Sequence, residues 1–285
     1  MPVAVITDST AHLPEGFADR RSIRVVPLHV LIDGVSGLDC IDVGPEALAE
    51  ALRQRRIVTT SRPTQTEFVA VFRTALAEGA DAVVSVHLSR DLSGTWEAAV
   101  LAAQEVGPDR VRIVDSRTTA MGLGFAALHA ADVAAAGGTP QEVEDAAVSA
   151  AKRSETMFVV ETLEHLRRGG RIGPAAALLG TALAVKPVLH IADGKICPLE
   201  KVRTMNRALA RLVELAVQAA GDEVVELAVH HLASPERAVE LANRLEERVP
   251  KSSGCVVSEL GAVIGAHTGP GVLGVVVQRL VAARG

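Results

Sequence analysis

Short runs of β-branched apolar residues alternate with amphipathic segments along the first half of the chain. The run Ala82 to Val86 is typical of a buried strand, and Glu97 to Val106 is typical of a helix. The same pattern predicts strands at 3–7, 23–30 and 111–114, and helices at 14–20, 45–53, 67–78 and 141–153. Such an alternation predicts a mostly parallel sheet flanked by helices.

The pattern changes after the helix predicted at 141–153. Two strand-like segments, 186–192 and 195–202, flank Asp193-Gly194, which is a strong signal for a hairpin and thus for antiparallel pairing. A further strand is predicted at 156–160, and helices at 161–168, 204–220 and 235–248. The sequence therefore predicts an α/β fold with two domains, residues 1–150 and residues 151–285.

Polar loops follow the predicted strands of the first half. They contain Asp8-Ser9, Thr59 to Thr64, Ser89 to Thr95, and Asp115-Ser116. Ligands of parallel sheets bind beyond the carboxyl ends of the strands, so these loops are expected at one rim. Ser93, Gly94 and Thr95 also open a helix, whose free N–H groups favour a carboxylate or phosphate. The alternative is an ordinary helix N-cap.

The segment Met121 to Ala127 imitates the glycine pattern of dinucleotide-binding loops. Its glycines come several residues after the strand, and no strand ending in an acidic residue follows at the required spacing. We therefore interpret these glycines as helix-packing positions.

Composition excludes several classes of protein. Aromatic residues are only 2% of the 285 residues, with no Tyr, so stacking platforms for single-stranded nucleic acid are nearly absent. The three cysteines are far apart, which suits a reduced compartment and gives no thiolate metal site. No signal peptide is recognisable in the first residues, and no uncharged run is long enough to span a membrane. A cytoplasmic protein without a resident metal is expected.

Charge distinguishes one segment from the rest. Between Glu161 and Arg211, nine Lys or Arg residues stand against four acids, a local charge of +5 in a chain of net charge −5. This is either a solvated face or a docking surface for an acidic partner or a phosphorylated ligand. Nearer the C-terminus, His267 lies among glycines and is either structural or a hydrogen-bond donor to an anion.

Ser93 and His267 offer a second interpretation, in which they form the nucleophile and base of an acyl hydrolase. The absence of a Gly-x-Ser-x-Gly elbow argues against it.

Taken together, the motifs resemble the DegV family over essentially the whole chain. They are Asp8-Ser9-Thr10, Thr60-Ser61-x-Pro63, Leu92-Ser93-Gly94-Thr95, Val114-Asp115-Ser116, Glu161-Thr162-Leu163-Glu164, Gly169-Gly170-Arg171-Ile172, Lys186-Pro187, Glu200-Lys201-Val202-Arg203 and His267-Thr268-Gly269-Pro270-Gly271. One departure is Arg90-Asp91, where family members usually carry Ser-Gly.

The resemblance implies a two-domain fold with a ligand tunnel between a mostly parallel N-terminal sheet and a mixed C-terminal sheet. Family members include the fatty-acid-binding subunits of bacterial fatty acid kinase, which hold a long-chain fatty acid while a separate kinase subunit forms the acyl phosphate. By position, the fatty acid carboxylate is expected at Thr60, Ser61, Ser93, Gly94, Thr95 and His267. The aliphatic segment Ala175 to Val185 is the expected tunnel wall.

Arg171 and Arg203 correspond to arginines of the family motifs, and we expect them to dock the kinase rather than to contact the fatty acid. The protein would then be a lipid carrier that binds no nucleic acid, has no cofactor and is not itself an enzyme. A Ser/His acyl hydrolase and a binding module for another amphipathic anion are the alternatives.

Overall fold

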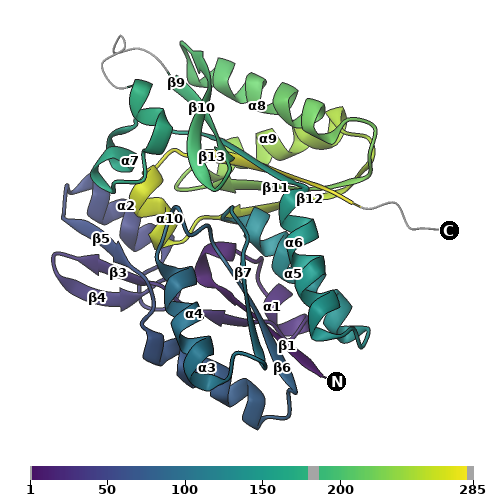
Figure 1. The fold of residues 1–285 in the computed structure, drawn as a ribbon. Helices are drawn as coiled ribbons and strands as arrows, with labels where there is room; N and C mark the ends of the chain where they lie inside the picture. The colour runs from purple at the N-terminus through teal and green to yellow at the C-terminus, as the bar shows by residue number, and fades with distance from the viewer. Residues whose placement is uncertain (1, 179–185, 281–285) are drawn as a thin grey trace.

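A four-stranded parallel sheet forms the centre of the first half of the chain, in the order β2-β1-β6-β7 (Figure 1). The computed structural model describes residues 2–178 and 186–280. The strands are β1 (Val3–Asp8), β2 (Arg24–Val26), β6 (Ala82–His87) and β7 (Val111–Asp115). Every neighbouring pair runs parallel, as the alternation of strands and helices predicted.

Helices cover both faces of this sheet. They are α3 (Gln65–Ala77) and α4 (Thr95–Val106) on one face, and α5 (Met121–Ala135) and α6 (Pro140–Lys152) on the other. Successive residues of β6 point to opposite faces, so Val83 packs with Phe68 of α3 while Val84 packs with Leu123 of α5. Near the N-terminus are the short helices η1 (Ser9–Ala11) and α1 (Phe17–Arg20).

The strand predicted at 23–30 is wrong as a single element. Pro27 divides it into β2, which pairs with β1, and β3 (His29–Ile32), which belongs to another sheet. Proline has no N–H for a ladder hydrogen bond, so it suits a break between strands. The next amide, Leu28 N–H, donates to the Ser9 hydroxyl at 3.2 Å instead.

A three-stranded antiparallel sheet, β4-β3-β5, lies beside α2 (Pro45–Arg53). Its outer strands are β4 (Val35–Leu38) and β5 (Val58–Ser61). Thr60 and Ser61 are therefore strand residues, opposite Val30 and His29, and their prediction as a loop on the rim of the parallel sheet is wrong. The helix that follows starts at Gln65, because Thr64 and Glu67 form a capping box.

The second half is built on a six-stranded mixed sheet in the order β10-β9-β8-β13-β11-β12. Its strands are β8 (Ser154–Val159), β9 (Lys186–Ala192), β10 (Lys195–Val202), β11 (Val225–His231), β12 (Ser252–Glu259) and β13 (Leu273–Arg279). The predicted hairpin is present as β9 and β10. Only β11 and β12 are parallel among the described pairs of this sheet. The predicted α/β fold, with a parallel and a mixed sheet, is confirmed.

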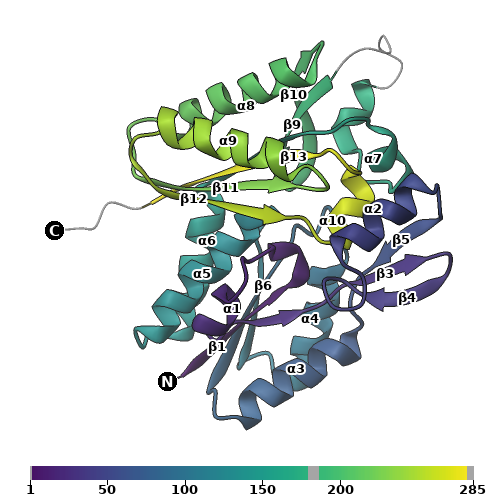
Figure 2. The same cartoon turned by 180° about the vertical axis from the view of Figure 1, so that it is seen from behind.

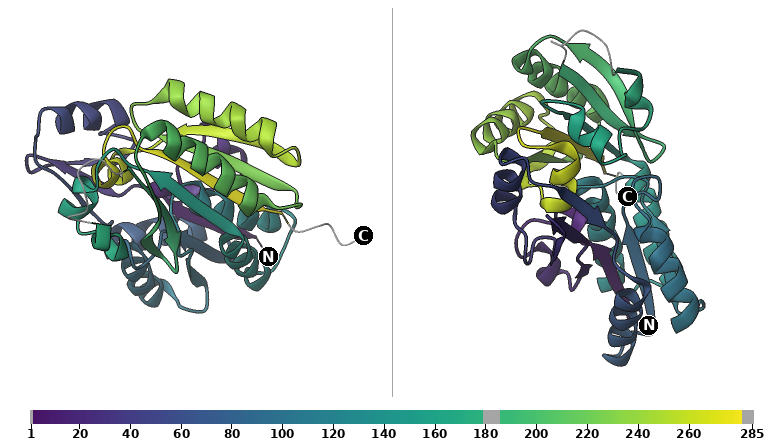
Figure 3. Two further views of the ribbon diagram at one scale, coloured as in Figure 1. Left: turned by 90° about the horizontal axis from the view of Figure 1, so that it is seen from above. Right: turned by 90° about the vertical axis from the view of Figure 1, so that its left-hand side faces the viewer.

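Two long helices, α8 (Met205–Ala220) and α9 (Pro235–Arg248), cover the mixed sheet on the side away from the parallel sheet (Figures 2 and 3). The short helices α7 (Glu164–Arg168), η2 (Gly173–Leu178) and α10 (Ala262–Thr268) complete the second half. Within residues 2–178 and 186–280, no helix combines the length and the apolar character needed to cross a membrane.

The glycines of α5 pack closely against neighbouring elements, as the sequence predicted. A Cβ on Gly124 would lie 2.8 Å from the Ala11 carbonyl oxygen. A Cβ on Gly122 would meet the hydroxyls of Thr118 and Thr156 at 2.6 and 2.9 Å. These positions let α5 approach η1 and β8.

Candidate functional site

A cavity lies between the carboxyl edge of the parallel sheet and the mixed sheet, with a wall completed by β5 and α10. The cavity and the open space at its mouth together occupy about 890 Å³. Most of the wall is aliphatic. These side chains are Leu28, Leu88, Leu92, Ala120, Ile191, Ile196, Leu260, Val263, Ile264, Val272, Val275 and Val276, together with Phe158. Such a wall favours a hydrocarbon chain as ligand.

One end of the cavity is polar, and contacts link its residues across the chain. The Thr60 hydroxyl lies 2.8 Å from His267 Nε2, a hydrogen bond between residues 207 positions apart. Ser61 and Ser93 line the same cavity. Arg171 connects this group, because its Nε donates to the Leu92 carbonyl at 3.0 Å and its Nη1 donates to the Gly169 carbonyl at 2.7 Å.

His267 is held in its neutral form at this end. Burial, followed by the charge of Arg171, lowers the pKa of His267 to about 4. Gly169 leaves room for the ring, since a Cβ there would lie 2.0 Å from His267 Nδ1. A neutral ring that donates from Nε2 to Thr60 leaves the Thr60 hydroxyl free to donate to a ligand. His267 thus positions Thr60.

Gly94 and Thr95 are predicted ligand-binding residues that do not line the cavity. Thr95 is buried behind Ser93. The two hydroxyls lie 2.9 Å apart, and Thr95 N–H donates to Ser93 Oγ at 3.3 Å. Ser93 therefore accepts from the first turn of α4 and also lines the cavity, so the N-cap role and the ligand-binding role predicted for this loop are compatible.

Arg171 was expected to dock the kinase rather than to contact the fatty acid, and the structure places it in the cavity wall. A guanidinium is well placed there because a carboxylate enclosed by apolar residues needs a positive partner. Its docking role stays a prediction. Arg203, in contrast, is exposed at the surface near the start of α8, and its part in docking also stays a prediction.

The predicted basic segment is largely paired with acids. The ion pairs are Arg167 and Arg168 with Glu164, Lys186 with Glu161, Lys195 with Asp91, and Arg211 with Glu200 and Glu214. Within the described residues, no ion pair or hydrogen bond of a side chain is found for Lys201, Arg203 or Arg207, which are exposed. The positive surface is thus concentrated where β10 meets α8.

The unusual pair Arg90-Asp91 is also directed away from the cavity. Arg90 lies 3.5 Å from Asp115 and packs over the Trp96 ring, while Asp91 lies 3.6 Å from Lys195. Neither residue lines the cavity. These charges therefore fix the loop rather than contact a ligand.

The structure does not assemble Ser93 and His267 as a nucleophile and base. His267 Nε2 is bonded to Thr60 and its Nδ1 has no partner in the described part of the chain, whereas a catalytic histidine is oriented by a third group.

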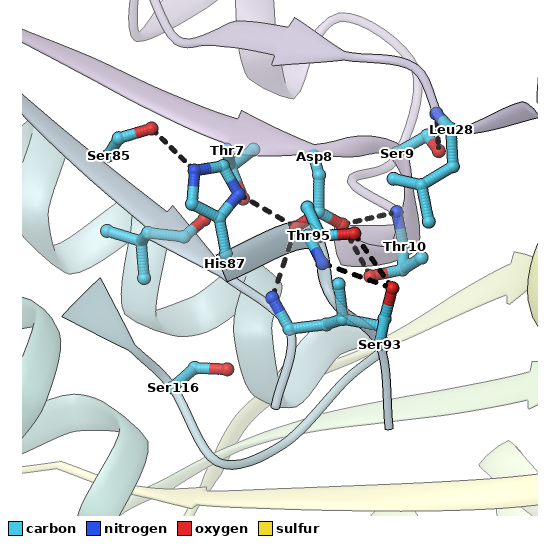
Figure 4. Close-up of polar contacts among 12 residues, drawn as sticks. Thr7, Asp8, Ser9, Thr10, Leu28, Ser85, His87, Ser93, Thr95 and Ser116 are labelled. Atoms are coloured by element: carbon cyan, nitrogen blue, oxygen red, sulfur yellow. Dashed lines mark hydrogen bonds and ion pairs between the residues drawn. The ribbon is translucent and has the colours of Figure 1, made fainter. Parts of the chain in front are cut away.

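A Ser–His–Asp arrangement does occur at Ser85, His87 and Asp8 (Figure 4). His87 Nδ1 lies 3.0 Å from Asp8 Oδ2, and His87 Nε2 lies 2.7 Å from Ser85 Oγ. All three residues are completely buried in the parallel sheet, so no substrate reaches Ser85. Asp8 also accepts from Leu88 N–H and Thr10 N–H. This network was not predicted from the sequence, and it joins the loops that follow β1 and β6.

Sequence reasoning missed other residues that line the cavity. Arg62 also lines the cavity. It directly follows the predicted residues Thr60 and Ser61, so its position in the sequence could have indicated that it belongs to the site. Thr10, Thr119, Thr156 and His230 come from separated elements and share no motif. Part of the predicted tunnel wall, residues 179–185, lies outside the described residues, whereas Ala175 and Leu178 pack in the same apolar cluster as Phe158.

In the part of the chain that the structure describes, no three His, Cys, Asp or Glu side chains are grouped to hold a metal ion.

Comparison with known proteins gives a consistent result. Residues 2–280 match the family described as "Uncharacterised protein, DegV family". A DegV domain-containing protein of Streptomyces coelicolor is 53% identical over 276 residues, covering 97% of this chain and 98% of the relative. Two solved structures are also similar. One, of a Thermus thermophilus DegV family protein and its fatty acid binding, has 34% identity and a TM-score of 0.94, covering 98% of this chain and 100% of its own. The other, DegV of Bacillus subtilis, described as a fatty acid binding protein, has 33% identity and a TM-score of 0.90 with the same coverage.

Proposed function

Because the chain belongs to the DegV family, we propose that it is a carrier that binds a long-chain fatty acid and presents the carboxylate to a separate kinase. The strongest support is the cavity itself, which is aliphatic along most of its wall and polar at one end. Burying about 14 methylenes supplies roughly 11 kcal/mol of gross transfer free energy, at about 0.8 kcal/mol each. Association costs reduce this figure.

The polar end suits a carboxylate. Arg171 supplies a permanent positive charge, and the hydroxyls of Thr60 and Ser93 supply neutral donors. His267 stays neutral and orients Thr60 through their shared hydrogen bond. Together these groups offset the loss of water around a buried carboxylate.

The kinase supplies the chemistry in this proposal. A carboxylate oxygen attacks the terminal phosphorus of ATP, an acyl phosphate forms, and ADP leaves with the bridging electron pair. The carrier keeps the acyl chain out of water and holds the carboxylate at the opening. An acyl hydrolase is less well supported, since Ser93 has no base beside it.

Mass spectrometry of lipid extracted from the purified protein tests the proposal directly. An intact long-chain fatty acid at near-equimolar amount is the expected result. A different amphipathic anion, or no lipid and no uptake of added fatty acid, contradicts it. Labelling of Ser93 by a fluorophosphonate would support the hydrolase instead.

We predict that Ser93→Ala and Thr60→Val each weaken fatty acid binding by about 1–3 kcal/mol, since each removes a donor to a buried charge. Isothermal titration with a single fatty acid measures the change. Thr59→Val is the matched control, because Thr59 lies on the same strand but is exposed outside the cavity. Unchanged affinity in both site variants would exclude these hydroxyls as ligands.

Arg203→Ala is predicted to bind fatty acid normally and to lose most of its acyl phosphate yield with a cognate kinase, because Arg203 is exposed and outside the cavity. Lipid retention and acyl phosphate are measured on one preparation. Arg248→Ala, an exposed arginine on α9, is the control. The wild-type yield should also fall with added salt, which screens exposed charge pairs. Normal yield from Arg203→Ala would remove this residue from the docking surface.

A further inference from the structure

A second hollow lies beside the carboxylate end of the apolar cavity. Together with the open space at its mouth it occupies about 1250 Å³. Its lining comes from α2, β5, α7 and α10 and from the residues next to them, and α10 contacts the other three elements (Figure 1). Thr60, Arg171 and His267 line both hollows, so the second one adjoins the proposed carboxylate site.

The lining of this second hollow is positive. Among the described residues it contains four arginines and two histidines and no acid, and we call it the basic groove. These residues are Arg55, Arg56, Arg168, Arg171, His165 and His267. Arginine keeps its charge at neutral pH. A groove lined by charges of one sign attracts ligands of the opposite sign, so the basic groove favours an anion.

Two of the arginines are partly neutralised by acids outside the groove. Arg56 Nε donates to Asp33 at 2.6 Å, and Arg168 Nε donates to Glu164 at 2.7 Å, and neither acid lines the groove. Arg171 donates to neutral carbonyls, and no ion pair offsets its charge within the described residues. The groove therefore keeps a net positive charge.

Arg55 adds a charge that nothing in the described chain offsets. Its side chain is exposed and makes no ion pair or hydrogen bond with a described residue. Its backbone is left-handed, with a φ of 58°, just after the end of α2. There Arg55 N–H donates to the Leu52 carbonyl and Arg56 N–H donates to the Ala51 carbonyl, as in a Schellman motif. Glycine is usual at this position, so the helix end gives no reason for an arginine, whereas an anionic ligand does.

We propose that the basic groove binds the phosphoryl group of an acyl phosphate while the acyl chain stays in the apolar cavity. This inference rests on the proposed carrier function and adds a second anion site to it. The phosphoryl group is joined to the acyl carbon through one oxygen, so it lies next to the carboxylate site, where the groove begins. Arg55 and Arg168 supply charge-assisted hydrogen bonds to it. No bond forms or breaks in the groove.

The charge of the two ligands explains why arginines beyond Arg171 are present. A fatty acid carboxylate carries one negative charge, which Arg171 balances. A phosphoryl group carries about two at neutral pH, and it extends past the carboxylate site. The further arginines are therefore needed only after phosphorylation, and they retain the product until a reaction that consumes acyl phosphate removes it.

The test compares two ligands with the same acyl chain on the full-length protein stripped of lipid. One is palmitic acid, and the other is the phosphonate analogue of palmitoyl phosphate, in which a methylene replaces the bridging oxygen and prevents hydrolysis. Isothermal titration measures the affinity for each. We expect Arg55→Gln and Arg168→Gln each to weaken phosphonate binding about tenfold and to change palmitic acid binding by less than about twofold.

The chain offers a matched control for each variant. Arg167→Gln is the control for Arg168→Gln, because Arg167 pairs with the same Glu164 but does not line the groove. Arg53→Gln is the control for Arg55→Gln, since Arg53 ends α2 and is outside the groove. Both controls should change phosphonate binding by less than about twofold. Arg55→Gly, which suits the left-handed backbone, serves if Arg55→Gln does not fold.

Three outcomes would overturn the inference while the carrier function stands. They are a wild-type protein that binds palmitic acid but not the phosphonate, groove variants that bind the phosphonate as tightly as the wild type, and groove variants that weaken both ligands by the same factor. Failure of the wild-type protein to bind palmitic acid would instead contradict the proposed function itself.

Discussion

Asp8→Ala is expected to lower the free energy of unfolding by about 3–5 kcal/mol. The carboxylate is completely buried and accepts hydrogen bonds from Thr10 N–H at 3.0 Å, Leu88 N–H at 3.1 Å and His87 Nδ1 at 3.0 Å. Removing it leaves these donors without a partner in the core, at about 1–3 kcal/mol for each that water does not reach. Urea denaturation followed by circular dichroism measures the change.

Two companion variants locate the effect. Ser85→Ala removes only the hydroxyl at the other side of His87 and should cost about 1 kcal/mol. Asp109→Ala removes an exposed carboxylate and should stay within about 0.5 kcal/mol of wild type. If Asp8→Ala is no more destabilised than Asp109→Ala, the network does not hold the loops together.

Acidification from about pH 6.5 to about pH 5 is expected to destabilise the protein by about 3 kcal/mol through two buried histidines. Burial is the main cause that lowers the pKa of His230 to about 3 and of His267 to about 4, from an ordinary 6.5. Between these values and 6.5 the unfolded chain binds more protons, so the contribution is full above about pH 6.5 and is lost as the pH falls. Each histidine accounts for about 1.5 kcal/mol over this range, because the unfolded chain is already half protonated at this group at pH 6.5.

Urea denaturation at the two pH values, with a common slope, measures this loss. His267→Gln should remove about 1.5 kcal/mol of this loss and leave the rest, because His230 and the other histidines whose pKa values burial lowers remain. Carboxylates change the free energy of unfolding only at lower pH, where they become protonated. The arginines Arg167 and Arg168, for example, hold the pKa of Glu164 at about 2, so this group matters only in stronger acid. A stability that does not change between the two pH values would show that both histidines are already accessible to protons.

Local patterns predicted the elements whose causes are local. The strand at Ala82 and the helix ending at Val106 appear almost as expected, because apolar periodicity and helix propensity act over a few residues. The pairing of strands that are far apart in the chain could not be predicted from local sequence patterns. Thr60 is a strand residue because it pairs with Val30 of β3. The residues near position 60 do not indicate this pairing.

In the candidate site, too, some residues could be predicted from the sequence and others could not. The hydroxyl and histidine side chains at Thr60, Ser93 and His267 could be selected by residue type, since an anion needs donors. The orientation of Arg171 into the cavity could not, because it depends on the carbonyls of Leu92 and Gly169, which only the folded chain brings into reach.

The hydrogen bond between Thr60 and His267 sets an order of events during synthesis. The two residues are 207 positions apart and form the same end of the cavity. A nascent chain that has completed the parallel sheet still lacks α10 and the inner wall supplied by β13. It therefore has no enclosed place for an acyl chain. Under the proposed function, a fatty acid is therefore enclosed only after β13 has been translated, and it cannot assist the folding of the parallel sheet.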